Sequence, residues 1–276
     1  MRKLLAISGG VDSVCLLHMF KDEPEILVAH FNHGTRPSSK DDEEFVKNLA
    51  EKYHKEFIVG RANLGSDVSE EKARNARYEF LRKIAEEKNA QIYTAHHLDD
   101  LIESITINLL RGTGWRGLVP LDAGDIIRPL ITKKYDKQKL LKYAAENNLT
   151  FRQDPTNTED NYLRNRIREK LRELSPAEKS QLTKLFYAQK NLKTEIDQIL
   201  NLVMENEKTY QRAWFKNSDT KTALELLRFI TKENQISLTR PELENFLNAI
   251  KTYAPEKSFN LPKNRLVKIH KTYFVL

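Results

Sequence analysis

A glycine-rich turn near the N-terminus, Ser8-Gly9-Gly10-Val11-Asp12-Ser13, constrains the fold of this chain more than any other feature of its sequence. It follows a short apolar run, residues 3–8, and precedes a helical pattern of apolar residues at 14–20. Glycines let a ligand approach the backbone, and a helix that begins beside such a turn carries partial positive charge at its N-terminus. The sequence therefore predicts a strand–turn–helix unit whose turn, with hydroxyl donors from its serines, holds a phosphate.

The alternation of strand and helix continues to about residue 130. Strands are expected over 3–8, 25–31, 56–59, 90–95 and 126–127, and helices over 38–52, 69–88 and 100–110. All nine glycines lie between Gly9 and Gly124, which suits the tight turns between such elements. Repeated β-α units with short strands predict an α/β fold with a doubly wound, mostly parallel sheet, which binds ligands at the carboxyl ends of its strands.

The remainder of the chain has a different pattern. Helices are expected over 136–147, 161–173, 175–206, 222–234 and 240–250, and a pair of β-strands over 265–270 and 272–276. We predict a catalytic domain over 1–174 and a smaller, mainly helical region over 175–276. Residues 171–276 hold 18 Lys and Arg against 12 Asp and Glu, which indicates that the C-terminal region binds a polyanion such as a nucleic acid, with a charged, soluble surface as the alternative.

Composition excludes several classes of protein. The single cysteine, Cys15, excludes an internal disulfide framework and a cysteine-rich metal site. No apolar run approaches the roughly 20 residues of a membrane helix, and the apolar stretch at the N-terminus is too short for a signal peptide. The Walker sequence of P-loop ATPases is missing. We therefore expect a soluble, cytoplasmic protein that does not contact a membrane.

Three acidic residues indicate a metal ion. Asp12 would repel a bare phosphate, so its place in the turn favours Mg²⁺ between the carboxylate and the phosphate. Asp100 and Glu103 are three residues apart and share one face of their expected helix. A zinc site with His96 and His97 is the alternative, but adjacent histidines point in different directions and a third nitrogen or sulfur ligand is not evident. The expected metal ligands are Asp12 and Asp100.

The turn at residues 8–13 resembles the PP-loop of the N-type ATP pyrophosphatases, which cleave ATP between its α- and β-phosphates. Further motifs occur at His30–Arg36, Glu71–Tyr78, His96–Glu103 with Arg111–Gly114 and Gly117-Leu118, Arg128-Pro129-Leu130, Asp154–Asn157 and Tyr162–Arg168. In this order and spacing, over roughly residues 3–172, they resemble the tRNA(Ile)-lysidine synthetases.

This resemblance implies a set of functional residues. The expected ATP-binding residues are Ser8, Gly9, Gly10, Val11, Asp12 and Ser13. The expected catalytic residues are Asp12, Arg74, Asp100 and Glu103, and the expected tRNA-binding residues are Arg111, Arg164, Asn165, Arg166 and Arg168. His33 and Arg36 are further candidates near the nucleotide. The division of roles between Asp100 and Glu103 stays open, as does whether Arg74 contacts an ATP phosphate or the tRNA.

The resemblance also implies a reaction. ATP with Mg²⁺ would adenylate the C2 oxygen of the first anticodon cytidine in isoleucine tRNA with a CAU anticodon, and L-lysine would then displace AMP to form lysidine. The alternatives are another PP-loop enzyme, such as a tRNA cytidine thiolase or an amidating synthetase, and a non-catalytic tRNA-binding protein. Cys15 lies on an apolar helix and is expected to be a buried structural thiol, which opposes sulfur transfer. A homodimer is among the expected assemblies.

Overall fold

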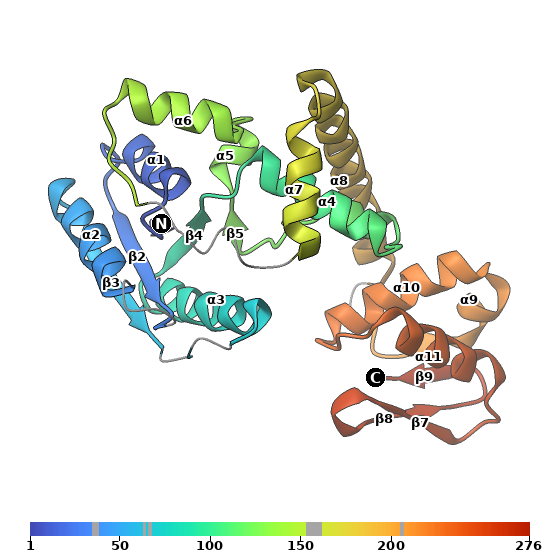
Figure 1. Cartoon of the computed structure of the whole chain (residues 1–276). Coiled ribbons are helices and arrows are strands. Elements are labelled where there is room, and N and C mark those ends of the chain that lie inside the picture. The colour runs from blue at the N-terminus through green and yellow to red at the C-terminus, as the bar shows by residue number, and fades with distance from the viewer. Residues whose placement is uncertain (35–38, 63–64, 66–67, 153–161, 205–206) are drawn as a thin grey trace. The chain divides into compact units, whose positions relative to one another are not determined.

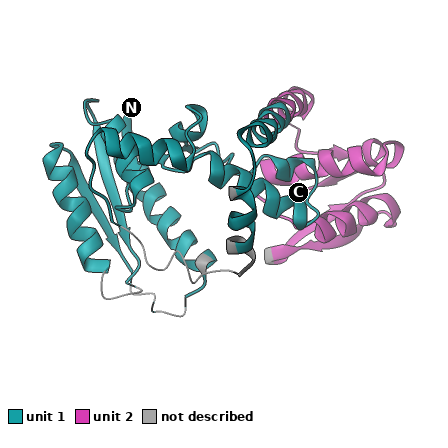
Figure 2. Cartoon of the chain, turned by 45° about the horizontal axis from the view of Figure 1, so that its top comes forward, with its two compact units in different colours: residues 1–189 teal, residues 190–276 magenta. Residues whose placement is uncertain are grey.

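The structure is a computed structural model that describes residues 1–34, 39–62, 65, 68–152, 162–204 and 207–276. The described residues form two compact units, residues 1–189 and 190–276, which Figure 2 colours separately. The division falls inside helix α8 (Pro176–Met204), whereas the predicted domain boundary after residue 174 immediately precedes that helix. That boundary stays a prediction.

Unit 1 is built on a five-stranded parallel sheet in the order β3-β2-β1-β4-β5 (Figure 1). Its strands are β1 (Arg2–Ala6), β2 (Ile26–Asn32), β3 (Glu56–Arg61), β4 (Ala90–Thr94) and β5 (Ile126–Ile127). The chain passes from β1 to β2 and β3 on one side of β1 and then continues to β4 and β5 on the other side. The predicted doubly wound α/β fold is therefore confirmed, with its change of winding direction between β1 and β4, where such sheets bind ligands.

Helices cover both faces of this sheet. The helices are α1 (Val11–Met19), α2 (Ser39–Lys52), α3 (Glu70–Glu87), α4 (Leu98–Leu110), α5 (Pro129–Thr132), α6 (Lys137–Glu146) and α7 (Tyr162–Arg172), with a short 3₁₀ helix, η1 (Trp115–Leu118). Successive side chains of a strand point to opposite faces. Leu5 and Val28 accordingly pack with α1, α2 and α6, whereas Leu4 and Leu27 pack with α3. Figure 1 shows α1 and α6 on one side of the sheet and α3 on the other.

Helix boundaries follow local capping. Ser69 accepts a hydrogen bond from the Lys72 amide at the start of α3, and Asp136 accepts one from the Lys139 amide at the start of α6. At the start of α8, the Ser175 amide and hydroxyl donate to Glu178, and Pro176 is the first helical residue. A capping side chain pairs with backbone groups that the first turn of a helix leaves unpaired, and so fixes where the helix begins. The observed ends of α3, α6 and α8 accordingly lie within about two residues of those predicted from the sequence.

Unit 2 combines helices with a small antiparallel sheet. Its elements after α8 are β6 (Tyr210–Gln211), α9 (Arg212–Asn217), α10 (Thr220–Glu233), α11 (Arg240–Thr252), β7 (Lys257–Leu261), η3 (Pro262–Asn264), β8 (Arg265–Ile269) and β9 (Tyr273–Val275). The sheet order is β6-β9-β8-β7. The predicted β-pair is confirmed by the antiparallel pairing of Ile269 with Phe274, but the sequence did not predict β6 or β7. Phe215, Phe246 and Phe274 are fully buried in a core of this unit's own residues.

In the described part of the chain, no helix is both long enough and apolar enough to cross a lipid bilayer.

Candidate active site

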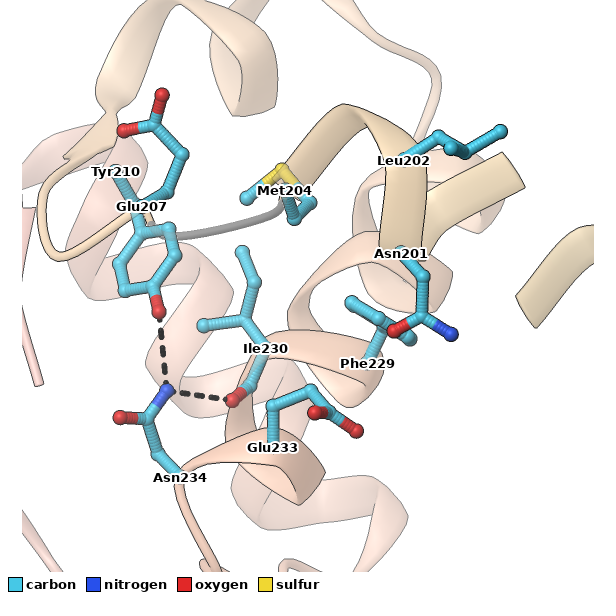
Figure 3. Close-up of a pocket in the computed structure, with 9 residues that line it drawn as sticks. All are labelled: Asn201, Leu202, Met204, Glu207, Tyr210, Phe229, Ile230, Glu233 and Asn234. Carbon is cyan, nitrogen blue, oxygen red and sulfur yellow. Dashed lines mark hydrogen bonds between the residues drawn. The ribbon is translucent and has the colours of Figure 1, made fainter. Parts of the chain in front are cut away.

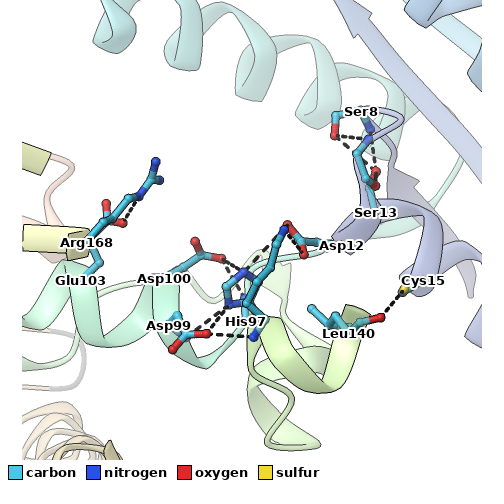
Figure 4. A network of polar contacts seen from close by, with 12 residues as sticks. Ser8, Asp12, Ser13, Cys15, His97, Asp99, Asp100, Glu103, Leu140 and Arg168 are labelled. Carbon is cyan, nitrogen blue, oxygen red and sulfur yellow. Dashed lines mark hydrogen bonds and ion pairs between the residues drawn. The ribbon is translucent and has the colours of Figure 1, made fainter. Parts of the chain in front are cut away.

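The predicted phosphate-binding turn joins β1 to α1 at the carboxyl edge of the sheet (Figure 4). The Ser13 hydroxyl accepts hydrogen bonds from the Ser8 and Gly9 amides, at 3.2 Å each, and donates to the Gly10 carbonyl at 2.9 Å. Gly9 has φ +94°, and a Cβ there would lie 3.4 Å from Phe45. Two backbone N–H groups thus point to one place directly before the N-terminus of α1, an arrangement suited to binding an anion.

Asp12, in the first turn of α1, forms an ion pair that the sequence did not predict. The Lys137 ammonium, at the first residue of α6, donates to both Asp12 carboxylate oxygens, at 2.8 and 3.0 Å. Nothing in the local sequence pattern relates these two residues, which lie 125 positions apart in the chain. Asp12 therefore faces positive charge, as a residue that holds a cation would.

His97 lies between the acidic side chains of this edge. Its Nδ1 accepts a hydrogen bond from the Asp99 amide at 3.2 Å, so the hydrogen of the neutral ring is on Nε2. That Nε2 lies 3.8 Å from an Asp12 oxygen and 3.6 Å from an Asp100 oxygen. Asp100 also accepts the His97 amide at 2.9 Å, which fixes the start of α4. Two of the predicted site carboxylates thus face one imidazole nitrogen (Figure 4).

The surroundings of Asp100 fit a divalent cation. Burial raises the pKa of Asp100 above its usual value, and the carboxylates of Asp12 and Glu103 raise it further, although His97 lowers it. A Mg²⁺ ion between Asp12 and Asp100 would relieve this repulsion, since Mg²⁺ commonly binds one or two carboxylates together with substrate phosphates. Within the described ranges, no cluster of three or more His, Cys, Asp or Glu side chains is arranged to hold a metal by itself. The zinc alternative thus finds no complete ligand set there.

Glu103 is buried, with 5% of the residue exposed, and accepts a 2.6 Å hydrogen bond from the Nε of Arg168. The predicted tRNA-binding residue Arg168 therefore contacts a predicted catalytic residue. Arg166 and Arg111 are exposed, the latter at the end of α4. The side chains of Arg164 and Asn165 lie outside the described part of the structure.

Asp99, the second residue of α4, contacts two other helices. It accepts the Lys137 amide and the Lys179 ammonium of α8, each at 2.8 Å. Burial would raise the pKa of Asp99, but these hydrogen bonds lower it below its usual value. The residue therefore links α4 to α6 and α8 beside the candidate site.

A second group of side chains at this edge is basic. Arg74 and Arg77 of α3 lie over the Tyr78 ring, with guanidinium carbons 5.0 and 5.3 Å from its centroid. Arg128, directly after β5, is buried. Burial, followed by the charges of Arg128, Arg77 and Arg74, lowers the pKa of His96 to about 3, so this imidazole is neutral at physiological pH. The sequence predicts a functional role for Arg74, which shares the motif Glu71–Tyr78 with Arg77, whereas the motif Arg128-Pro129-Leu130 comes with no role for Arg128.

The remaining candidates have different surroundings. Burial and the charge of Arg77 lower the pKa of His33 to about 4, and its Nδ1 is buried without a hydrogen-bond partner. Arg36 lies outside the described residues. Cys15 is buried, its thiol donates to the Leu140 carbonyl at 3.4 Å, and burial raises its pKa to about 11. The predicted structural role of this thiol is confirmed.

Unit 2 contains a pocket of about 560 Å³. Figure 3 shows its lining residues, among them Tyr210, Glu207 and Glu233. Tyr210 and Asn234 hydrogen-bond to each other at 3.0 Å in its wall. None of the residues predicted by number to bind ATP or tRNA lines this pocket, although its lining belongs to the predicted C-terminal region, residues 175–276.

Comparison with known proteins bears on these residues as a set. Residues 1–175 match the PP-loop domain family. This range includes all the candidate-site residues just described at the carboxyl edge of the sheet except Lys179. The chain belongs to the PP-loop family. Its structure is also similar to that of the U34-tRNA thiolase NcsA from Methanococcus maripaludis, with a TM-score of 0.58 over 70% of this chain and 72% of that chain, at 18% identity. That likeness supports the fold alone.

Curated PP-loop relatives are named tRNA(Ile)-lysidine synthase. The protein of Persephonella marina is 37% identical over 182 residues, 60% of this chain and 40% of the relative. The protein of Thermosipho africanus is 39% identical over 184 residues, 62% of this chain and 43% of the relative. The protein of Thermotoga maritima is 28% identical over 270 residues, 90% of this chain and 64% of the relative. The predicted resemblance is confirmed, and the chain aligns with less than half of the length of the first two relatives.

Proposed function

We propose that this chain is an ATP-dependent ligase that joins L-lysine to C2 of the first anticodon cytidine of isoleucine tRNA with a CAU anticodon. The observation that carries the proposal is the meeting of the PP-loop turn, Asp12 and Asp100 at the change of winding direction of the sheet. Within the PP-loop family, the names of the relatives support this reaction. The cell compartment would be the cytoplasm, where tRNA is modified, and a homodimer stays a prediction.

The turn would bind the ATP phosphates. The amides of Ser8 and Gly9 now donate to the Ser13 hydroxyl, and a phosphate oxygen would take the place of that acceptor or join it. Asp12 and Asp100 would hold Mg²⁺, which when bound supplies positive charge next to the phosphates. Lys137, released from Asp12 by the cation, would lie within reach of the same phosphates. Together these donors would stabilise the negative charge that develops when pyrophosphate leaves.

The two chemical steps need only ATP, the tRNA and lysine. The cytidine O2 attacks the α-phosphorus of ATP, and the bond to pyrophosphate breaks. The lysine amino group then attacks C2, the bond between C2 and O2 breaks, and AMP leaves with that oxygen. Glu103 would orient the lysine ammonium or accept its proton, with Arg168 fixing the carboxylate at 2.6 Å.

The basic C-terminal region, residues 175–276, would add contacts to the tRNA backbone. Phosphate contacts of this kind set affinity and its dependence on salt, rather than the choice of sequence.

A lysine-transfer assay tests the proposal. The protein is mixed with ATP, Mg²⁺, radiolabelled lysine and CAU-anticodon isoleucine tRNA, and elongator methionine tRNA is the control. We expect label in the isoleucine tRNA alone, and loss of transfer in Asp12→Ala. AMP release without label would indicate another PP-loop reaction, such as thiolation, which the buried Cys15 disfavours. Folded protein that neither transfers label nor releases AMP would indicate a tRNA-binding protein without catalytic activity.

A further inference from the structure

The adjacent residues His96 and His97 divide the carboxyl edge of the sheet into two regions of opposite charge. The His97 ring faces the carboxylates of Asp12 and Asp100, which lie with α1 and α4. The His96 ring is held by Thr94, at 2.8 Å, and lies in the field of three arginines. An acidic region suited to a cation and a basic region suited to an anion therefore adjoin each other.

Tyr78 is the centre of the basic region. The residue is 6% exposed. The guanidinium carbons of Arg74 and Arg77 lie over its ring, 5.0 and 5.3 Å from the ring centroid. Its hydroxyl is buried and has no hydrogen-bond partner that satisfies ordinary geometry. Arg82 also approaches the ring, at 5.8 Å, but its guanidinium is paired with Asp125 at 2.6 Å. Arg74 and Arg77 lie one helical turn apart on one face of α3, so both can reach the same ligand.

Arg128 adds a buried charge to this region. It is 8% exposed, its Nη1 donates to the Ile126 carbonyl at 3.1 Å, and its Nε has no hydrogen-bond partner. Burial lowers the pKa of Arg128, the adjoining Tyr78 hydroxyl and, to a lesser extent, Asp122 oppose this shift, and the charge of Arg74 adds to it. A buried guanidinium without a full set of acceptors is costly. An anion bound here would reduce that cost.

The anion of the basic region differs from the one expected at the PP-loop turn. That turn leads into α1 and the core that α1 shares with α2 and α6, whereas Arg74, Arg77 and Tyr78 belong to α3, which covers the opposite face. The amides of the turn and the metal ligands would take up the phosphates of ATP. If the chain modifies an RNA base, that base must reach the same edge, and its flanking backbone phosphates come with it.

We propose that Arg74, Arg77 and Arg128 bind a backbone phosphate of the RNA substrate next to the nucleotide that is modified. The proposal rests on the proposed function. It assigns Arg74 to the RNA, whereas the sequence left open whether Arg74 contacts an ATP phosphate or the tRNA. Arginine suits the task because its planar guanidinium binds phosphate through two parallel hydrogen bonds. Arg74 and Arg77 would contact the phosphate directly. The buried charge of Arg128 would add to the electrostatic attraction for it.

RNA binding without catalysis tests this site. The affinity for a CAU-anticodon stem-loop RNA is measured by fluorescence anisotropy over a range of salt concentrations, for the wild type, Arg74→Gln and Arg74→Gln/Arg77→Gln. Lys83→Gln is the matched control, because it removes a positive charge from an exposed position on the same helix. We expect Arg74→Gln to weaken RNA binding roughly tenfold and to lower the salt slope by about 0.7, the value for one phosphate contact on a single strand. Lys83→Gln should change neither quantity, and circular dichroism verifies folding.

Two further measurements separate the sources of the phosphate. ATP affinity, measured without RNA, should be the same in Arg74→Gln and the wild type; weaker ATP binding with unchanged RNA binding would overturn the proposal and assign the site to ATP. Stem-loops with a single neutral methylphosphonate identify the contact. A methylphosphonate at one position next to the target cytidine should weaken RNA binding by the wild type. The same substitution should cause no further loss of RNA binding in Arg74→Gln. Equal losses in both proteins at every position would also overturn it.

The lysine-transfer assay on the wild type keeps this result distinct from the proposed function. A wild type that transfers lysine, with Arg74→Gln binding RNA as the wild type does, refutes the phosphate site and leaves the ligase. A wild type that transfers no lysine refutes the ligase, while the RNA-binding comparison still decides whether the phosphate site exists.

Discussion

Glu103 is a carboxylate in the interior of unit 1, and its contact with Arg168 explains how a charge is kept there. The Nε of Arg168 donates to Glu103 at 2.6 Å, whereas the Arg168 side chain itself is 42% exposed. A buried carboxylate that loses its cation keeps the cost of desolvation without the compensating attraction. The pair therefore contributes both to stability and to the orientation of a proposed catalytic group.

Substitution of Arg168 should accordingly affect both properties. We expect Arg168→Met to destabilise unit 1 by about 2 kcal/mol and to lower lysine transfer, while Lys170→Met, an exposed charge on the same helix, changes neither. Urea unfolding followed by circular dichroism gives the stability, and the radiolabel assay gives the activity. Equal stability of Arg168→Met and the wild type would show that Glu103 does not depend on this contact.

At the level of single residues, the sequence predicts the acids of the candidate site but not what surrounds them. Asp12 and Asp100 each come shortly after a predicted strand, and a parallel sheet brings the carboxyl ends of its strands to one edge, so their nearness is compatible with the predicted fold. Lys137 and Arg168 contact their carboxylates across 125 and 65 residues. Such contacts depend on how helices pack, and no local pattern in the sequence encodes them. Arg128 belongs to the motif Arg128-Pro129-Leu130, but a single arginine before a proline carries no indication that it is buried.

Among the elements, α2 is attached to the sheet through Glu43. This carboxylate pairs with Arg61 of β3 and accepts a 3.0 Å hydrogen bond from the side chain of Asn32 in β2. The hydrogen bond from Arg61, together with that from Asn32, lowers the pKa of Glu43 below its usual value, although burial opposes the shift. One side chain thus holds a helix to two adjacent strands.

The lowered pKa of Glu43 predicts a dependence of stability on pH. Because the folded-state pKa lies below the unfolded one, the ionised group stabilises the fold above about pH 4, and this contribution disappears as the pH falls through the folded-state pKa. We expect Glu43→Gln to lower Tm by about 2 °C at neutral pH and by less in acid. Glu51→Gln, on the same helix with an exposed side chain, is the control. A Tm difference for Glu43→Gln that does not vary with pH would contradict the assignment.

The elements themselves were predictable where each depends on its own residues. The five strands of unit 1 and the long helices have clear apolar patterns and capping residues, so their positions follow from the sequence. Strand β7 was missed because its sequence, Lys-Ser-Phe-Asn-Leu, is mostly polar and buries only Leu261. It is held by pairing with β8, in which Phe259 lies opposite Val267. The short helix α9 has too few residues for a recognisable period.

In the whole molecule, the two units have separate hydrophobic cores, and unit 2 depends on a buried arginine. Arg212 is 3% exposed, and its guanidinium donates to the carbonyls of Ile250, Tyr253 and His270 at 2.7, 2.8 and 3.0 Å. These three carbonyls come from the end of α11, the residue that follows it and the turn between β8 and β9. One side chain thus joins the helices of unit 2 to its sheet.

Loss of that arginine should loosen one unit alone. Arg212→Met removes the donor from one buried and two partly buried carbonyls, and we expect unit 2 to lose about 3 kcal/mol of stability. Hydrogen exchange followed by mass spectrometry should show roughly hundredfold faster exchange for the core peptides of residues 190–276 and unchanged exchange in β1 and β4. Lys216→Met, on the same helix and exposed, is the control. Faster exchange throughout both units would mean that they unfold together.

The buried thiol described above gives this protein a natural chemical reporter. Cys15 is the only cysteine of the chain, and it lies two residues beyond the PP-loop turn. Its thiol donates to the Leu140 carbonyl of α6. With its pKa at about 11, almost no reactive thiolate is present at neutral pH, and the thiol is reached only when α1 and α6 separate. The rate of alkylation by a maleimide therefore measures how often the end of unit 1 that carries the PP-loop turn opens. No engineered label is needed, because a ligand that holds the turn closed would lower the rate at which Cys15 is alkylated.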